Sequence, residues 1–243
     1  MSFGDMLHFA NALSDKHGFQ RCYTVSECES DSDMCIDATF AGPDCTGYRL
    51  PSLAEWQLAA SAGYPWSCMA EVDDEDMEFG ADSCGGFPAE KYAVSIGNSG
   101  VSYPGCVDCT VQLRAPCGHS CCGPHAIASL GRSLYGLHDL IGNVMEPTGT
   151  VLDTNVTDGP PYPGTSSPRL LDSARERAPH GDWTDPGYSV SLSTQIPVAF
   201  VGGSFRQFAL EMCWNRHSAV APFHSSSNVG LRLVRTVTIG ESP

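Results

Sequence analysis

Cysteine content is the feature that most restricts how this chain can fold. Its 243 residues include twelve cysteines, and eleven of them lie before residue 123. This even number indicates up to six disulfides in an oxidising compartment, or metal sites in a reducing one. We favour disulfides, and therefore a secreted protein of the extracellular space or periplasm. Met1 leads straight into a helix-like segment, so we expect any export signal to have been removed or to lie upstream.

Charge and hydropathy exclude two classes of partner. The formal net charge is −15 and only two lysines are present, so the basic surface that nucleic acid requires is missing. No run of about 18 apolar residues occurs, so we predict no membrane span. The hydrophobic content of 42% is enough for one large core. These properties leave a protein or peptide ligand open and do not determine an oligomeric state.

Local patterns predict two helices near the start of the chain. In residues 2–14, apolar side chains recur at helical spacing, and Gly18 follows as a stop signal. A second helix should begin after Ser52, because Ser52 and Glu55 form a capping box and Trp56 then lies on an apolar face.

The remaining segments read as strands and loops. Residues 20–46 and 153–190 are polar or rich in turn residues, so we expect an irregular, disulfide-stapled loop and a long surface loop. Residues 200–204 and 229–234 are predicted strands. Helices early, strands late and no alternating βαβ pattern together predict an α+β fold.

Two clusters have more than one interpretation. Residues 71–82 contain seven carboxylates, which favour a solvated loop over a calcium site because EF-hand ligand spacing is missing. Residues 106–122 contain five cysteines, for which disulfides and a zinc site are both possible.

Three segments, in order, carry a resemblance to a known family. Residues 48–56 read Y-R-L-P-S-L-A-E-W, and residues 135–146 read Y-G-L-H-D-L-I-G-N-V-M-E. Residues 202–205 read G-G-S-F, and residues 228–233 read N-V-G-L-R-L. These segments are similar to Y-R-L-P-T-E-A-E-W, G-L-Y-D-M-x-G-N-V-W-E-W and R-G-G-S-W … L-G-F-R-L. The chain thus resembles the formylglycine-generating-enzyme, or sulfatase-modifying factor, family.

The resemblance implies a fold and a domain. The fold is a loop-rich variant of the C-type-lectin-like fold, with a small twisted antiparallel sheet. One domain would span residues 1–236, with cysteine-rich insertions at about 20–46 and 100–125 and a tail at 237–243. The N-terminal strands usual in the family are not recognisable, so we expect an incomplete sheet or one completed by another segment. Met145 and Pro147 stand where the family has tryptophans.

Catalysis is not expected. The family's oxidases use copper and two cysteines shortly after the Gly-Gly-Ser motif, and the corresponding positions here are Gln207 and Met212. Cu(I) prefers thiolates, so this chain should lack the oxidase activity and hold neither copper nor the iron of related enzymes. The alternative is a divergent metal-dependent oxidase of the same fold.

The resemblance also implies a structural calcium ion. The matching ligands are side-chain oxygens of Asp139 and Glu146 and backbone carbonyls of Gly142 and Val144, and hard oxygen ligands suit Ca²⁺. The alternative is that Asp139 only caps backbone N–H groups in a turn.

Without thiols, the segment after Gly-Gly-Ser is a candidate binding surface. Aromatic and arginine side chains are common anchors of recognition sites. The candidate residues are Phe205, Arg206, Gln207, Trp214, Asn215 and His217. We therefore predict a non-catalytic binding module for an acidic or amide-rich peptide, with core packing as the competing role of Trp214.

Overall fold

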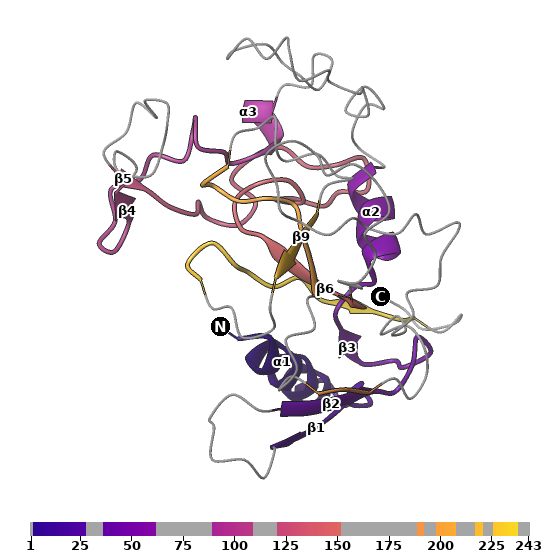
Figure 1. Cartoon of the computed structure of the whole chain (residues 1–243). Helices are drawn as coiled ribbons and strands as arrows, with labels where there is room; N and C mark the ends of the chain where they lie inside the picture. The colour runs from indigo at the N-terminus through magenta and orange to yellow at the C-terminus, as the bar shows by residue number, and fades with distance from the viewer. Residues whose placement is uncertain are drawn as a thin grey trace, which may run out of the picture.

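The computed structural model describes residues 2–27, 36–61, 89–108, 121–151, 189–191, 198–207, 217–220 and 226–237 (Figure 1). Within these ranges the helices are α1 (Phe3–Lys16), α2 (Leu53–Ser61) and α3 (Ala89–Tyr92). The strands are β1 (Tyr23–Glu27), β2 (Ile36–Phe40), β3 (Tyr48–Arg49), β4 (Val107–Asp108), β5 (Cys121–Cys122), β6 (Glu146–Val151), β7 (Ser189–Ser191), β8 (Val198–Val201), β9 (His217–Val220) and β10 (Val234–Arg235).

Helix α1 begins and ends as the sequence predicts. Ser2 caps its first turn, with Ser2 Oγ accepting from the Asp5 amide at 3.2 Å and Asp5 Oδ2 accepting from the Ser2 amide at 2.7 Å. Gly18, just after its end, has a φ of +73°, a conformation that glycine adopts without strain. The apolar face of α1 is buried beside β1 and β3 (Figure 1).

The predicted irregular loop over residues 20–46 is wrong in part, because it contains paired strands. β1 and β2 are antiparallel, with Tyr23 opposite Phe40 and Val25 opposite Ala38, and β7 adds a third strand beside β2. Apolar and polar residues alternate in both strands, but the many polar residues of the segment hide this pattern when the sequence is read alone. The predicted staple is present, since Cys22 and Cys45 form a disulfide with a Cα–Cα distance of 5.6 Å.

The β6-β8-β9 sheet lies at the centre of the described structure, and β8 is its middle strand (Figure 1). All four residues of β8 are buried. Val198 and Phe200 pack into a core with α1, β1 and β2, whereas Val201 packs with α2 and residues 137–141. The two-residue period of a strand explains this, because successive side chains face opposite sides. β8 thereby joins two parts of the core.

The predicted strands near the end of the chain are shorter than expected. Strand β8 ends at Val201, because Gly202 and Gly203 have φ values of +84° and +68°. In the segment 229–234, Val229 forms an isolated bridge to Met145, and only Val234 belongs to a strand, β10, which pairs with β3.

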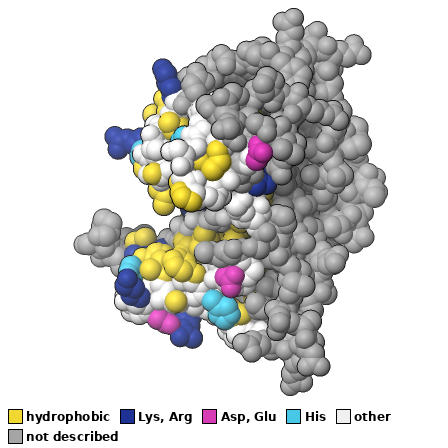
Figure 2. Space-filling view, turned by 90° about the vertical axis from the view of Figure 1, so that its left-hand side faces the viewer, with side chains coloured by type: hydrophobic (Ala, Val, Ile, Leu, Met, Phe, Trp, Pro, Cys, Tyr) yellow, Lys and Arg dark blue, Asp and Glu magenta, His cyan; other side chains and the backbone are white. Residues whose placement is uncertain are grey.

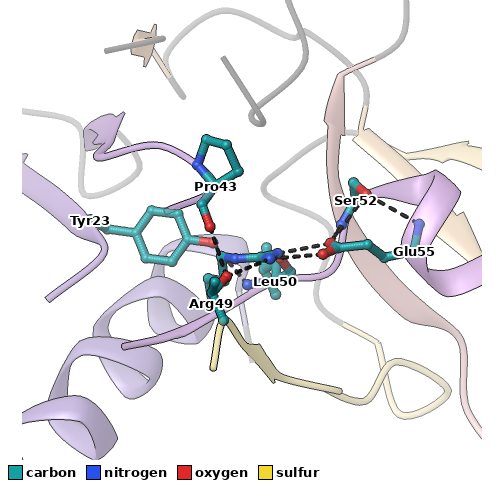
Figure 3. A network of polar contacts seen from close by, with 7 residues as sticks. Tyr23, Pro43, Arg49, Leu50, Ser52 and Glu55 are labelled. Atoms are coloured by element: carbon teal, nitrogen blue, oxygen red, sulfur yellow. Dashed lines mark hydrogen bonds and ion pairs between the residues drawn. The ribbon is translucent and has the colours of Figure 1, made fainter. Parts of the chain in front are cut away.

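A network of polar contacts around Arg49, in β3, connects several helices and strands (Figure 3). Arg49 donates two hydrogen bonds to the Glu55 carboxylate, at 2.7 and 2.8 Å, and one to Thr236 Oγ1 at 3.1 Å. Glu55 also closes the predicted capping box with Ser52 at the start of α2. The Tyr23 hydroxyl accepts from the Leu50 amide at 2.8 Å. The network therefore joins β1, β3, α2 and the C-terminal segment.

The architecture confirms the predicted α+β class, with a few helices and small antiparallel sheets. None of the helices in the described ranges has the length and apolar content needed to cross a bilayer.

Candidate functional site

The segment from Asp139 to Glu146, which the sequence linked to calcium, is a tight turn held by its neighbours. Asp139, Gly142 and Asn143 all have positive φ values. The Gly142 amide donates to the Gly202 carbonyl at 2.6 Å, and the Asn143 amide donates to the Val94 carbonyl at 2.8 Å. A Cβ atom on Gly142 would collide with the Val94 backbone. The turn thus requires glycine both for its conformation and for its close packing.

Glu146, at the end of this turn, is buried in an ion pair. Its carboxylate accepts from Arg232 Nε at 2.8 and 3.0 Å and from Trp56 Nε1 at 2.8 Å. Burial raises the pKa of the Glu146 carboxyl, and the Arg232 guanidinium opposes that shift. Arg232 Nη2 also donates to the His138 carbonyl at 2.8 Å. One guanidinium therefore bonds both ends of the segment.

These contacts do not fit the calcium ligand set that the sequence implied. Both oxygens of Glu146 accept hydrogen bonds from Arg232, so a cation bound there would lie beside a guanidinium charge. Asp139 Oδ2 accepts from the Ala128 amide at 2.7 Å, which matches the alternative capping role. In the described ranges, no three His, Cys, Asp or Glu side chains gather as a metal-binding group. Calcium stays an untested prediction for which Glu146 is poorly placed.

The segment after Gly-Gly-Ser forms the first of two adjacent turns. Ser204 to Gln207 close a turn through a 2.9 Å bond from the Gln207 amide to the Ser204 carbonyl. The Phe205 amide donates to the Asn143 carbonyl at 2.9 Å, and the Ile96 amide donates to the Gln207 carbonyl at 2.9 Å. The turn is consequently fastened on both sides to segments of the fold.

The second turn spans Ser226 to Val229 and is also anchored. The Val229 amide donates to the Ser226 carbonyl at 3.3 Å, and the Met145 amide donates to the Asn228 carbonyl at 2.8 Å. Side chains link the two turns: Arg206 Nη2 donates to Ser227 Oγ at 3.3 Å, and Asn228 Nδ2 donates to Ser204 Oγ at 3.4 Å. We call residues 204–207 and 226–229 together the two-turn site.

Two polar atoms of the two-turn site are buried without a hydrogen-bond partner. They are Nε of Arg206, a donor, and Oδ1 of Asn228, an acceptor; among the described residues, Arg49 Nε and His125 Nε2 have the same property outside this site. An unpaired buried polar atom costs about 1–3 kcal/mol, so native structures rarely keep one without a reason. Because neither atom is exposed to solvent, a ligand could pair with them only after the side chains that cover them move.

The predicted binding residues have different positions in the structure. Phe205 is fully buried with Val94 and Cys122, because its ring fills the core beneath the turn, so it offers no surface to a ligand. Arg206 is partly exposed, and its guanidinium lies 5.6 Å from the centre of the Phe205 ring. Gln207 Oε1 accepts from the Ser204 amide at 2.9 Å, so this side chain closes the turn where the family has its first thiol.

Other predicted positions fall beyond what the structure describes. Met212, Trp214 and Asn215 lie outside the described residues, and for His217 only the backbone is described, at the start of β9 opposite Val201. Sequence reasoning did not single out Asn228, Ser227 or Arg232 as site residues. Asn228 and Arg232 belong to the N-V-G-L-R-L motif, whereas Ser227 lies just before it and has no comparable signal.

The cysteines of the described residues are all disulfide-bonded. Cys106 pairs with Cys121, Cys22 pairs with Cys45, and Cys122 is disulfide-bonded as well. Thiolates from Cys106 and Cys121 are therefore not available to zinc. This favours the disulfide interpretation of the 106–122 cluster.

Seven large hydrophobic side chains of the described residues are exposed, and three of them lie in the segment 127–135. Ile127, Leu134 and Tyr135 have exposed fractions of 88%, 86% and 62%. Leu134 and Tyr135 are at the tip of a turn closed by a 2.9 Å bond between Gly136 and Ser133. Figure 2 shows hydrophobic side chains on two parts of one face, with single charged side chains around them and a hollow at the edge between the two parts.

Comparison with solved structures identifies the fold. Variable protein 1 of Treponema denticola has a TM-score of 0.55 at 20% identity, and the match covers 96% of this chain and 68% of that one. The protein CarF has a TM-score of 0.53 at 21% identity, with 98% and 66% covered. PvdO from Pseudomonas aeruginosa has a TM-score of 0.50 at 16% identity, with 98% and 60% covered. The chain thus spans about two thirds or less of the length of these three proteins.

The sequence comparisons identify the family. No curated protein matches the chain. The family profile described as "Sulfatase-modifying factor enzyme 1-like domain" matches residues 1–237. This match covers nearly the whole chain, and the solved structures share its fold. The chain belongs to the family of sulfatase-modifying factor enzyme 1-like domains.

Proposed function

We propose that this chain is a secreted, disulfide-stabilised, non-catalytic domain that binds a protein or peptide through the two-turn site. The observation that carries the proposal is the pair of buried, unpartnered atoms, Arg206 Nε and Asn228 Oδ1. They lie on turns whose backbone is fastened to the fold, so a ligand would need to displace only the side chains that cover them. Variable protein 1 of Treponema denticola shares this fold, and its name is consistent with a scaffold that carries a changeable surface.

The absence of catalysis is part of the proposal. Gln207, at the position of the first family thiol, uses its side-chain oxygen to close the turn, and an amide is not a ligand for Cu(I). A cysteine-containing sulfatase peptide incubated with the protein, copper and oxygen should gain no aldehyde. Turnover of that peptide would instead support the divergent oxidase.

Secretion is supported by the cysteines. All five in the described residues are in disulfides, and such bonds persist in oxidising compartments. Calcium forms no part of this proposal, because the Glu146 carboxylate is bonded to Arg232 and Trp56.

Display of random peptides against the oxidised full-length chain tests the binding function. Peptides selected on the wild type should lose at least about tenfold in affinity on Arg206→Ala, since a charge-assisted hydrogen bond contributes about 1.5–3 kcal/mol. Arg132→Ala is a matched control, because Arg132 is exposed outside the two-turn site. Peptides that bind both variants and the wild type equally would place the binding surface elsewhere and overturn the proposal.

A further inference from the structure

We infer that the chain has a second interaction surface, on the hairpin of residues 132–138 and its neighbours, which docks an acidic polypeptide segment that carries apolar side chains. Three exposed hydrophobic side chains and two exposed cations form it, and we call them together the hairpin surface. They are Ile127, Leu134, Tyr135, Lys91 and Arg132. None of them belongs to the two-turn site, so the inference goes beyond the proposed function.

Two of the hydrophobic side chains lie at the closed tip of the hairpin. The Ser133 amide donates to the Leu137 carbonyl at 2.8 Å, and the Gly136 amide donates to the Ser133 carbonyl at 2.9 Å. These bonds hold the backbone around Leu134 and Tyr135, whose side chains are nevertheless exposed. Solvent-facing hydrophobic side chains on a fixed backbone lose little conformational freedom when a partner covers them.

The third hydrophobic side chain is tied to the foot of the same hairpin. Ile127 precedes Ala128, whose amide donates at 2.7 Å to Oδ2 of Asp139, the residue that directly follows the hairpin. Ala128 has a φ of +59°, a conformation that a residue other than glycine keeps only when its surroundings fix it. The position of Ile127 is therefore specified by the fold, although its side chain packs against little of it.

The two cations come from neighbouring parts of the backbone. The Gly131 amide donates to the Lys91 carbonyl at 2.7 Å, and Arg132 follows directly. Three other arginines form ion pairs with carboxylates, whereas Lys91 and Arg132 form neither an ion pair nor a side-chain hydrogen bond with the described residues. Their charges are thus available to a partner.

The charge of this part of the chain differs from that of the whole. Residues 109–138 contain no Asp or Glu, although the chain has 28 acidic residues and a net charge of −15. Acidic residues occur at the borders: Glu90, whose side chain lies outside the described part, and Asp139, which accepts from the Ala128 amide. Between these borders the charged side chains are basic, so they complement an acidic partner.

A polypeptide segment fits this surface better than an anionic membrane does. A bilayer presents negative charge to a whole face of the protein, and a chain with a net charge of −15 is repelled by it. A short segment responds to the charges within about one Debye length, roughly 8 Å at physiological ionic strength. Its apolar side chains would cover Ile127, Leu134 and Tyr135 while its carboxylates meet Lys91 and Arg132.

NMR titration of the isotope-labelled, oxidised full-length chain tests the inference. The main probe is a short synthetic peptide in which Glu and Leu alternate. One control peptide has Gln in place of Glu and another has Ser in place of Leu. We expect saturable shifts of the backbone amides of residues 126–136 with the Glu–Leu peptide, and affinities at least about threefold weaker for both controls. The affinity of the Glu–Leu peptide should also fall as salt is added.

Variants assign the two parts of the surface. Leu134→Ser should weaken the Glu–Leu peptide at least about tenfold, the scale of one leucine side chain that is no longer buried. Arg132→Glu should weaken it about threefold to tenfold at low salt, because an attraction becomes a repulsion. The matched controls are Phe9→Ser and Lys16→Glu, which change exposed residues of α1, at the other end of the described structure from α3 (Figure 1). They should leave the affinity unchanged.

Several results would overturn the inference. They are equal binding of the Gln–Leu and Glu–Leu peptides, unchanged affinity in both hairpin variants, equal losses in the α1 controls, or binding to phosphatidylglycerol vesicles without binding to the peptide. The proposed function is judged separately. Peptides from the display experiment that depend on Arg206 and not on Arg132 support the two-turn site, whatever the titration shows.

Discussion

Arg49 ends the short strand β3 and Arg206 lies in a turn, and the two arginines differ in the hydrogen-bond partners that surround them. Arg49 is buried and reaches Glu55, Leu50 and Thr236 through both terminal nitrogens, while its Nε, like that of Arg206, is buried without a partner (Figure 3). Arg206 is partly exposed and has one weak side-chain bond, to Ser227, at 3.3 Å.

The comparison separates a structural arginine from a candidate binding arginine. Arg49 itself lies in β3 and its side chain bonds to α2 and to the C-terminal segment, so its role is to hold these elements together. The guanidinium of Arg206 adds only the Ser227 bond between two turns that backbone bonds already anchor. Stability should therefore depend strongly on Arg49 and Arg232, whose ion pairs are buried or partly buried, and weakly on Arg206, whereas ligand capture should show the reverse order.

Removing Arg232 should have the largest effect on stability. Arg232→Leu leaves the buried Glu146 carboxylate without its guanidinium, and breaking a buried pair in this way costs about 3–5 kcal/mol. Denaturant unfolding measures the change. The double variant Arg232→Leu with Glu146→Leu is the control and should recover much of the loss, because no buried charge remains. A single-variant loss below about 1 kcal/mol would contradict a structural role for this ion pair.

Removing Arg49 should have an intermediate effect. Arg49→Leu should cost about 1–2 kcal/mol, because its hydrogen bonds are lost while Glu55 stays partly solvated. Unfolding in denaturant at neutral pH checks this value. A cost as large as that of Arg232→Leu would contradict the distinction between the two ion pairs.

The ion pair between Arg49 and Glu55 also predicts that stability depends on pH. Burial raises the pKa of Glu55, but hydrogen bonds from Arg49 and Ser52 outweigh it and hold the pKa below the ordinary value. The stabilisation from this lowered pKa is present above the unfolded pKa, about 4.3, and is lost as the pH falls through the folded pKa. The stability difference between wild type and Glu55→Gln should therefore narrow as the pH falls below about 4, measured by thermal melts. A constant difference would show that Glu55 is not ionically bonded to Arg49.

Removing Arg206 should leave stability almost unchanged. Arg206→Ala should alter the unfolding free energy by less than about 0.5 kcal/mol, the usual range for surface substitutions, because one long hydrogen bond is exchanged for the release of an unpaired buried donor. Unfolding in denaturant, as for Arg49→Leu, provides the comparison. A loss near that of Arg49→Leu would make Arg206 a structural residue.

Calcium removal should have the smallest effect. A site saturated a hundredfold would add about 2.7 kcal/mol, or roughly 5–10 °C in Tm for a chain of this size. Because Glu146 is bonded to Arg232 and Trp56, we expect a chelator to shift the Tm by less than about 1 °C. A drop of several degrees that calcium reverses, and that Asp139→Ala abolishes, would restore the predicted calcium site.

Local patterns in the sequence were sufficient to predict several features of this structure. The apolar spacing of residues 2–14 and the Ser52–Glu55 capping box predicted α1 and α2, because helix contacts lie within four residues. The three ordered motifs predicted the family, and the cysteine count predicted the disulfides found in the described residues. The mixed alternation of residues 20–46 was not sufficient, because pairing of β2 with β7 depends on a segment about 150 residues away.

What the sequence by itself determined is therefore the fold class, the family and the main helices. The tertiary structure alone decided which side chains meet. It paired Glu146 with Arg232, 86 residues later, and so gave a predicted calcium ligand a guanidinium partner. It buried Phe205, and it placed Asn228 beside Ser204 with one acceptor unpaired. Composition and residue spacing do not predict these contacts, because the hydrogen-bond partners depend on how segments distant in sequence pack together.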